Sequence, residues 1–260
     1  MEIRPDRSRA EHRFAEVLEA LRRERRRTAD ELEALKAFED RIRSIDAESE
    51  TMTVAGRRSL NATETTGLDR VRTAYEATLM SVPHYFEEYD DTYVESVAEE
   101  FSPDIAAAMT DGTGFNSRCK RAVLSAASNS QAARESLLGV IDRERESVEA
   151  SKGDLLPLIT ECTNLGSVPF ESLGFGALDA YRTRLGTIRK HCRGLSDRRQ
   201  GAIFDQRRIQ RIPADVPDVT VYFYQGIDAD YPVMSLVAEL LDSIASLERS
   251  VEGAMTRCRA

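Results

Sequence analysis

The chain contains no tryptophan and very little lysine. Lysine accounts for four of its 260 residues, and the rest of the 36 Lys and Arg residues are arginine. The 45 Asp and Glu residues outnumber them and give a formal net charge of −9. Because an acidic surface repels nucleic-acid phosphates and anionic lipid, general binding to either is not expected. A salt-adapted cytoplasm favours this acid-rich, lysine-poor balance, and a GC-rich genome would also favour arginine.

Long apolar runs and paired cysteines are missing as well. No window approaches the roughly 20 apolar residues of a membrane-spanning helix, and the first residues, MEIRPDRSRAEHR, lack the apolar segment of a signal peptide. The four cysteines, Cys119, Cys162, Cys192 and Cys258, form no C-x-x-C pair, which fits neither a zinc site nor a small disulfide scaffold. These absences predict a cytoplasmic protein with reduced thiols and no membrane insertion.

The motifs of common catalytic and cofactor sites are also absent. The sequence has no P-loop, no G-x-S-x-G elbow and no H-E-x-x-H. Its three histidines, His12, His84 and His191, lie off the apolar faces of their expected helices, which argues against histidine acid–base chemistry inside a core. We therefore predict no catalytic residue, no cofactor and no cofactor-binding residue.

The segment Arg72–Phe101 has the most informative pattern. At about 100° per residue, one apolar face of this segment is expected to pack into a core. The members of that face are Val82, Phe86, Tyr89, Tyr93 and Val97. Pro83 has no N–H to donate, so a kink or a new helix start is expected there.

Four residues of metal-ligand type share the opposite face of that segment. They are His84, Glu87, Glu88 and Asp91. Imidazole and carboxylate groups suit a metal ion, but the di-metal sites of helical bundles project inward, whereas this face is expected to meet water. We therefore favour a solvated acidic face over a metal site.

Three charged residues fall on apolar faces, namely Asp90, Glu144 and Arg199. An unpaired buried charge costs several kcal/mol, so each is expected to have a partner. Glu144 is the preferred partner of Arg199, and such a pair would fix the register of two helices. The alternative interpretation is a polar site inside the bundle.

Several long helices are marked by their spacing. A seven-residue repeat between Arg9 and Asp46 predicts a long helix. A break is expected in the arginine-rich run Arg22–Arg27, because Thr28 and Glu31 match a capping box that would restart the helix after it. That run is typical of a solvated helix face, and nucleic-acid binding through it is the weaker alternative. From Leu178 to Ile209 apolar residues recur at spacings of three and four, as in a coiled coil. Val219–Gln225 fits either a short strand or a helical turn.

Together these patterns predict an all-α protein, a helical bundle of long amphipathic helices with coiled-coil character. We expect an N-terminal helical arm over residues 1–48, a Ser/Thr-rich linker over residues 49–66 and a bundle core over residues 67–260.

The run VRTAYEATLMSVPHYFEEYDDTYVESVAEEF, with the later YFYQ and YPVMS segments, resembles an uncharacterised helical family of halophilic archaea. The resemblance spans the chain from about Phe14 to Met255. It implies a helical, cytoplasmic protein of a high-salt cell, and it brings no activity, ligand or catalytic residue.

The function expected from these observations is a non-catalytic interaction or regulatory module that acts through a protein partner or through self-association of its helices. The alternative is a helical bundle that binds a small molecule or a metal ion, including an enzyme of that kind. Long amphipathic helices fit packing within one chain and packing between two chains equally well.

Overall fold

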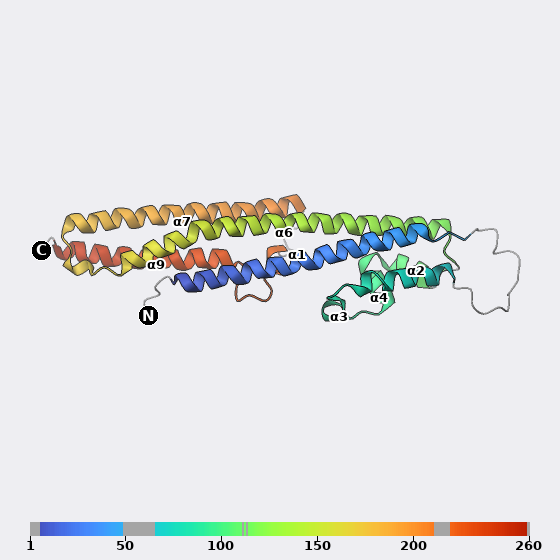
Figure 1. The fold of residues 1–260 in the computed structure, drawn as a ribbon. Helices are drawn as coiled ribbons and strands as arrows, with labels where there is room; N and C mark the ends of the chain where they lie inside the picture. Colours follow the sequence, from blue (N-terminus) through green and yellow to red (C-terminus); the bar gives the residue numbers. More distant parts are fainter. Residues whose placement is uncertain (1–5, 49–65, 111, 113, 211–218, 259–260) are drawn as a thin grey trace, which may run out of the picture. The chain divides into compact units, whose positions relative to one another are not determined.

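The computed structural model describes residues 6–48, 66–110, 112, 114–210 and 219–258, and within them the chain is helical (Figure 1). The predicted all-α class is confirmed, since the described residues form no strand beyond an isolated bridge between Glu48 and Asn116. Val219–Gln225 starts as a helical turn, α8 (Val219–Phe223). None of the helices in the described ranges is long and apolar enough to cross a membrane.

The first helix, α1 (Arg7–Ser44), runs through the arginine-rich run without the expected break. Arginine and glutamate are good helix formers, and ion pairs one turn apart, such as Arg22 with Glu19 at 3.2 Å, offset the repulsion between neighbouring arginines. Thr28 is buried inside the helix, so it does not begin a new one. The prediction of a break in α1 was wrong because charge density is not a helix-stop signal.

The chain folds as two compact units. Unit 1 holds the residues up to Glu24 and those from Val140 onward, and unit 2 holds Arg25–Gly139. Both α1 and α6 (Ser117–Gly166) contribute residues to each unit. The predicted division into residues 1–48, 49–66 and 67–260 followed the order of the chain, and it stays a prediction because residues 49–65 of the expected linker lie outside the described residues.

Unit 1 gathers long helices around one apolar seam. Besides α8 it contains η3 (Phe170–Ser172), α7 (Phe175–Gln210) and α9 (Pro232–Cys258), and α7 lies beside α9 (Figure 1). The buried residues of α7 follow the predicted spacing, and they include Leu178, Leu185, Ile188, Cys192 and Leu195. Cross-helix ion pairs add to this packing: Arg184 pairs with Glu161 of α6, and Arg189 pairs with Glu248 of α9.

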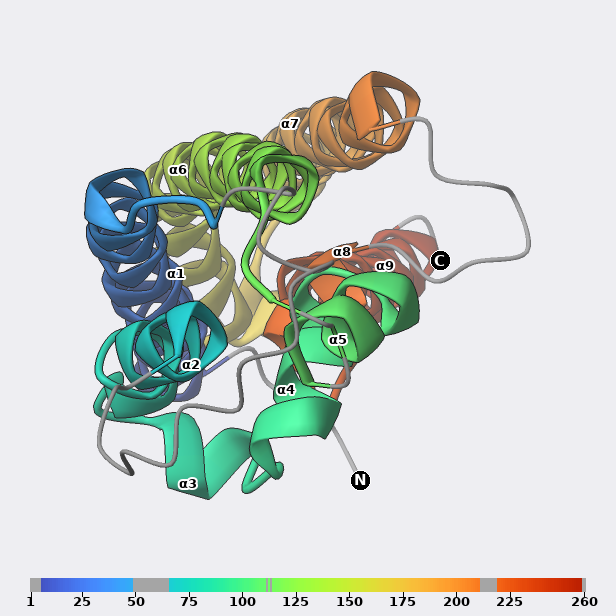
Figure 2. The same ribbon diagram turned by 90° about the vertical axis from the view of Figure 1, so that its right-hand side faces the viewer.

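Unit 2 packs short helices against segments of α1 and α6. The short elements are α2 (Gly67–Glu76), η2 (Leu79–Ser81), α3 (Tyr85–Glu88), α4 (Tyr93–Glu100) and α5 (Pro103–Thr110), and α2, α4 and α5 cluster together (Figure 2). Their core centres on Tyr75, whose ring lies 5.5 Å from Phe38, 5.6 Å from Tyr93 and 5.9 Å from Phe101 between centroids. Edge-to-face rings at these distances add to the free energy gained by burying them.

The segment after Pro83 differs from the single helix that the sequence analysis expected. Asp90 has φ of 49°, a left-handed conformation that ends α3 after one turn. Thr92 and Glu95 then form a capping box that starts α4, with each side chain accepting a hydrogen bond from the other residue's backbone N–H. The side chains of a helix that restarts no longer continue the spacing of the helix before it. The apolar face expected from Val82 to Val97 is therefore not continuous.

The consequence is a different division between buried and exposed side chains. Tyr93 and Val97 are buried as predicted. Phe86 is 76% exposed and Tyr89 is 48% exposed, whereas both were expected in the core. His84, expected to face water, is buried.

The two ends of the expected linker meet in unit 2. The backbone N–H of Glu48 donates to the carbonyl oxygen of Phe115 at 2.8 Å, and the N–H of Gly67 donates to the Glu48 carboxylate at 3.2 Å. A Cβ atom at position 67 would lie 2.8 Å from the Cβ of Phe115 and 2.7 Å from a Glu48 oxygen. Glycine is therefore needed for the close approach at Gly67.

Candidate functional site

The four candidate metal-ligand residues are not brought together. His84 points to Glu31 of α1, with Nε2 3.1 Å from the carboxylate oxygen, and Glu88 pairs with Arg27. Glu87 is exposed and Asp91 is partly exposed. Across the described part of the chain, no three His, Cys, Asp or Glu residues are grouped so that they could hold a metal ion.

The three charged residues predicted on apolar faces have different outcomes. Asp90 is exposed, so its predicted burial was wrong, because the residue lies in the turn between α3 and α4. Glu144 and Arg199 are both buried, and they contact each other as predicted. Arg199 Nη1 donates to Glu144 at 2.9 Å and to the Ser147 hydroxyl at 2.9 Å, while its Nη2 donates to the second Glu144 oxygen.

Tyr224, which follows α8, also reaches Glu144 and donates its hydroxyl to the carboxylate. Burial, together with the negative charge of Glu144, raises the pKa of Tyr224 well above its ordinary value. Burial works against the charge of Arg199, but the hydrogen bonds and charge of Glu144 outweigh it and raise the pKa of the guanidinium. Since every charge here is compensated, the cluster has the character of an internal link between α6, α7 and the residue after α8.

Unit 2 contains a partly enclosed pocket of about 190 Å³. Its apolar and aromatic wall includes Leu35, Tyr75, Leu79, Val82, Tyr85 and Tyr89. Its polar wall consists of Glu31, Asp91, Ser96, Glu99, Glu100 and Arg134. Apolar walls with a few convergent polar groups are the usual composition of a small-molecule site.

Arg134 of α6 organises the polar wall. Its Nε donates to Glu31 at 2.9 Å and its Nη2 donates to Glu100 at 2.6 Å, so one guanidinium joins α1 to α4. Burial works against the charge of Arg134, but the two carboxylates outweigh it and raise its pKa. The other oxygen of Glu100, Oε1, is buried and has no hydrogen-bond partner among the residues that the structure describes.

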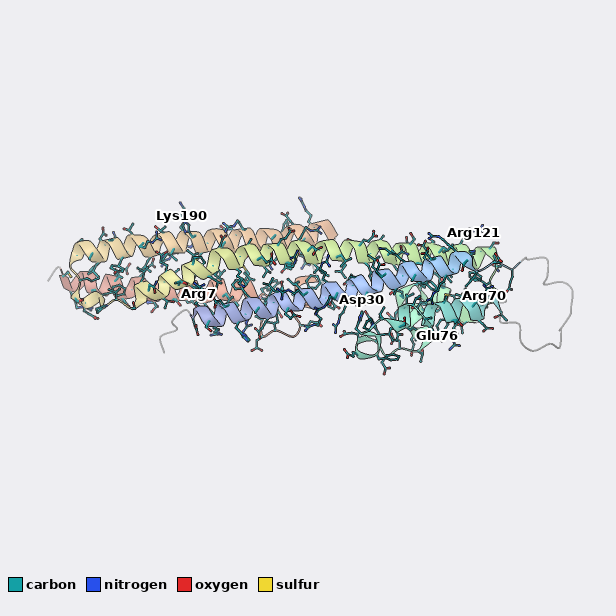
Figure 3. All side chains as sticks on the ribbon, viewed as in Figure 1. Arg7, Asp30, Arg70, Glu76, Arg121 and Lys190 are labelled. Atoms are coloured by element: carbon teal, nitrogen blue, oxygen red, sulfur yellow. The ribbon has the colours of Figure 1, made fainter. Side chains whose placement is uncertain are left out.

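Glu31 is the most heavily bonded carboxylate of the pocket. Asp30, labelled in Figure 3, is exposed on α1, whereas the neighbouring Glu31 has a side chain only 16% exposed. Its Oε1 accepts from the Tyr89 hydroxyl at 2.8 Å and contacts His84. Burial alone would raise the pKa of Glu31, but the His84 hydrogen bond, the Arg134 charge and the Tyr89 hydrogen bond together hold it below its ordinary value.

The tyrosines are held by their hydroxyl groups. The Tyr75 hydroxyl lies 3.0 Å from the Ser96 hydroxyl, and that of Tyr85 donates to the Asp91 carbonyl oxygen at 3.3 Å. Burial raises the pKa of both Tyr75 and Tyr85, so both phenols are protonated at neutral pH. The pocket therefore combines tyrosine rings with acidic side chains.

Two of the four cysteines, Cys162 and Cys192, are buried in unit 1. Burial raises the pKa of Cys162 to about 12 and that of Cys192 to about 11, which keeps both as thiols. A thiol is a poor nucleophile compared with a thiolate. Neither cysteine lines the pocket.

Sequence analysis missed Glu31, Glu100 and Arg134 as members of one site. Glu31 was assigned to a capping box with Thr28, and no local pattern connects it to Arg134, which is 103 residues away. The capping-box signature Thr92–Glu95 was available in the sequence and would have predicted the break before α4.

Comparison with curated proteins gave no match, and comparison with solved structures gave none either. A family model described as a domain of unknown function (DUF7260) matches residues 12–248, which is most of the chain. This range includes the helices that form the pocket and both members of the Glu144–Arg199 pair. The chain therefore belongs to the family defined by the domain of unknown function DUF7260.

Proposed function

We propose that this chain is a non-catalytic binding and regulatory module whose recognition site is the pocket of unit 2. The observation that carries the proposal is the pocket itself, which is lined by three tyrosines, by aliphatic residues and by the Glu31–Arg134–Glu100 network. The proposal joins the regulatory role expected from the sequence with its small-molecule alternative.

The protonation states of the pocket favour binding over catalysis. An efficient general acid or base has a pKa near the working pH. In the pocket the pKa of Glu31 is held below its ordinary value and that of Tyr75 is raised, so both move away from neutrality. Arg134 stays charged and has both of its carboxylate partners. Such groups can orient a ligand, but they are poorly suited to exchange protons with it.

Replacing either of two alanines of α1 by phenylalanine tests the proposal. Ala34 lines the pocket, whereas Ala37, about one turn further along, is exposed and does not. A ligand that binds only the folded state raises the melting temperature by mass action. We expect members of a chemically mixed fragment library to stabilise the wild-type protein and Ala37→Phe but not Ala34→Phe. If no fragment distinguishes Ala34→Phe from Ala37→Phe, the pocket is not a binding site.

Exposed aromatic side chains favour a second candidate function, protein binding. Phe86 is 76% exposed on α3 and lies beside the exposed acids Glu87 and Asp90. Exposed aromatic residues are frequent hot spots of protein interfaces. The partner that fits is a protein whose basic surface surrounds an apolar socket. Self-association of this chain would be a separate outcome.

Affinity capture with matched variants tests this second candidate. Phe86→Ala removes the aromatic side chain of α3, and Phe204→Ala removes another aromatic residue, 66% exposed on α7. We expect a basic protein to be retained by the wild type and by Phe204→Ala, to be lost with Phe86→Ala and to elute as salt is raised. Equal retention by all three forms would contradict the role of Phe86, and a concentration-dependent sedimentation coefficient would indicate self-association.

We also propose that the module works in the cytoplasm of a halophilic archaeon. The support is the net charge of −9 together with the small number of lysines. At about 1 M salt the Debye length falls to roughly 3 Å, so repulsion between exposed acids is screened. The melting temperature is therefore expected to rise from low to molar KCl, and a flat or falling curve would remove this part of the proposal.

A further inference from the structure

We infer that the ligand of the unit 2 pocket is a small organic cation of the alkylammonium type. The inference rests on the proposed function, because it names the ligand class for the same pocket. Three features of the pocket carry it: the charge of the lining, the placement of the tyrosines and the volume.

The lining has an excess of negative charge. Four carboxylates, those of Glu31, Asp91, Glu99 and Glu100, stand against the single guanidinium of Arg134, which leaves a formal charge of −3. Charges a few ångströms apart interact more strongly where solvent is partly excluded than in bulk water. An anion entering this pocket is therefore repelled, and a cation is attracted.

Arg134 does not provide a compensating anion site. Its Nε and Nη2 atoms are both directed at carboxylates, and its side chain is 24% exposed. An anionic ligand would have to compete with Glu31 and Glu100 for this guanidinium. A cation leaves the network intact and adds a positive charge next to Glu100, whose buried Oε1 accepts no hydrogen bond within the described part of the chain.

The aromatic wall suits a cation that carries alkyl groups. Tyr75, Tyr85 and Tyr89 line the same pocket, and the rings of Tyr85 and Tyr89 lie 5.7 Å apart between centroids. Tyrosine rings attract ammonium groups placed over their faces, and the effect is larger where water is excluded. The aliphatic residues Leu35, Leu79 and Val82 contact alkyl groups, whereas a bare metal ion would require oxygen ligands in their place.

The volume limits the size of the ligand. The pocket measures about 190 Å³. An apolar cavity of about 150 Å³ is large enough for benzene, so this pocket accepts a molecule slightly larger than benzene. Choline has that size and carries a quaternary ammonium group, which makes it a suitable probe.

The test compares choline with its neutral carbon isostere, 3,3-dimethylbutan-1-ol, by titration calorimetry at constant ionic strength. The two probes have nearly the same shape and differ in charge. We expect saturable binding of choline to the full-length protein, weaker binding of the alcohol, and loss of choline binding in Ala34→Phe but not in Ala37→Phe.

Two variant pairs separate the charge contribution from the ring contribution. Glu99→Gln removes an exposed acid of the pocket, and Glu87→Gln removes an exposed acid outside it. We expect only Glu99→Gln to weaken choline binding, with a smaller effect at high salt. Tyr89→Leu removes a half-exposed ring and should weaken binding by roughly 2- to 30-fold, whereas Tyr89→Phe retains the ring and retains binding.

The outcomes distinguish the two proposals. The cation inference is overturned if the alcohol binds as tightly as choline, or if only anionic fragments bind. In either case the pocket remains a binding site provided that Ala34→Phe blocks the binding. If Glu99→Gln and Tyr89→Leu bind choline as tightly as the wild type, the inference is also overturned. If neither probe binds and no fragment is sensitive to Ala34→Phe, the proposed function fails together with the inference.

Discussion

Arg199 of α7 donates from both terminal nitrogens to the carboxylate of Glu144 on α6, and the two side chains are 3% and 1% exposed. The favourable attraction in such a pair is largely offset by the cost of removing both charges from water. Its main effect is therefore on specificity: any other register of α6 and α7 would leave a buried charge without a partner.

Arg199→Ala is expected to lower the free energy of unfolding by about 3 kcal/mol or more, because it leaves a cavity and an unpaired buried carboxylate. Arg199→Leu should cost less, since leucine refills the seam. The double variant with Glu144→Leu should recover stability, since it removes both charges. Chemical denaturation measures all three.

The neighbouring Arg198 provides the control for this series. It is 66% exposed and pairs with the exposed Asp154 at 2.5 Å. Arg198→Ala is expected to change stability by less than about 1 kcal/mol. An Arg199→Ala effect no larger than that of Arg198→Ala would mean that the Glu144 pair is solvated in solution.

Glu31 should make the stability of unit 2 sensitive to acid. Its pKa is lowered in the folded state by the His84 hydrogen bond, the Arg134 charge and the Tyr89 hydrogen bond, which outweigh the opposing effect of burial. The unfolded chain therefore binds the proton more readily, so this contribution is fully present above about pH 4.5 and is lost as the pH falls through the folded-state pKa.

The measurement is the difference in stability between wild type and Glu31→Gln across the acid range. At neutral pH we expect a loss of about 1.5 to 3 kcal/mol, typical of hydrogen bonds to a charged group, and the difference should shrink below pH 4.5 or so. Glu33→Gln, a change at a 73% exposed side chain of the same helix, should show neither effect. A loss of stability that does not vary with pH would mean that Glu31 does not stabilise unit 2 through its ionised form.

Tyr93 and Phe86 are expected to respond oppositely to truncation. Tyr93 is buried, with its ring 5.6 Å from that of Tyr75, so Tyr93→Ala should cost about 3 to 5 kcal/mol. Phe86→Ala should be within about 0.5 kcal/mol of the wild type, as is usual for exposed positions. Thermal melts of the two variants check this, and comparable losses would restore the single-helix interpretation of the segment.

Asp90 has a backbone conformation that most side chains avoid, with φ of 49°. Asp90→Gly should leave stability unchanged or increase it, because glycine adopts this conformation without a steric penalty. Asp90→Val should lower stability by about 1 to 2 kcal/mol, because a β-branched side chain clashes there. If valine is tolerated as well as glycine, α3 does not end at this turn in solution.

The sequence predicted the buried face of α7 well. The seam from Leu178 to Leu195 and the Arg199–Glu144 contact both follow from regular spacing along α7. The same reasoning failed for His84, Phe86 and Asp90, because residues 89–92 separate α3 from α4 and the helical phase is reset between them. Periodicity says nothing about side chains beyond such a break.

The pocket could not be predicted for a different reason. Glu31, Glu100 and Arg134 come from three helices that are far apart in the sequence, and each residue alone is typical of a solvated helix face. Their association depends on tertiary packing, which the spacing within one helix does not encode. A single sequence contains no signal that relates Arg134 to Glu31.

Gly67 donates a hydrogen bond to Glu48, so the fold around these two residues does not depend on the length of the chain between them. Because this bond and the Glu48–Phe115 bond already hold both ends in place, insertions between residues 48 and 67 need not move α1 or α2. For loops in general, doubling the length costs only about 0.6 kcal/mol in closure entropy. This position is therefore a natural point for inserting a reporter domain.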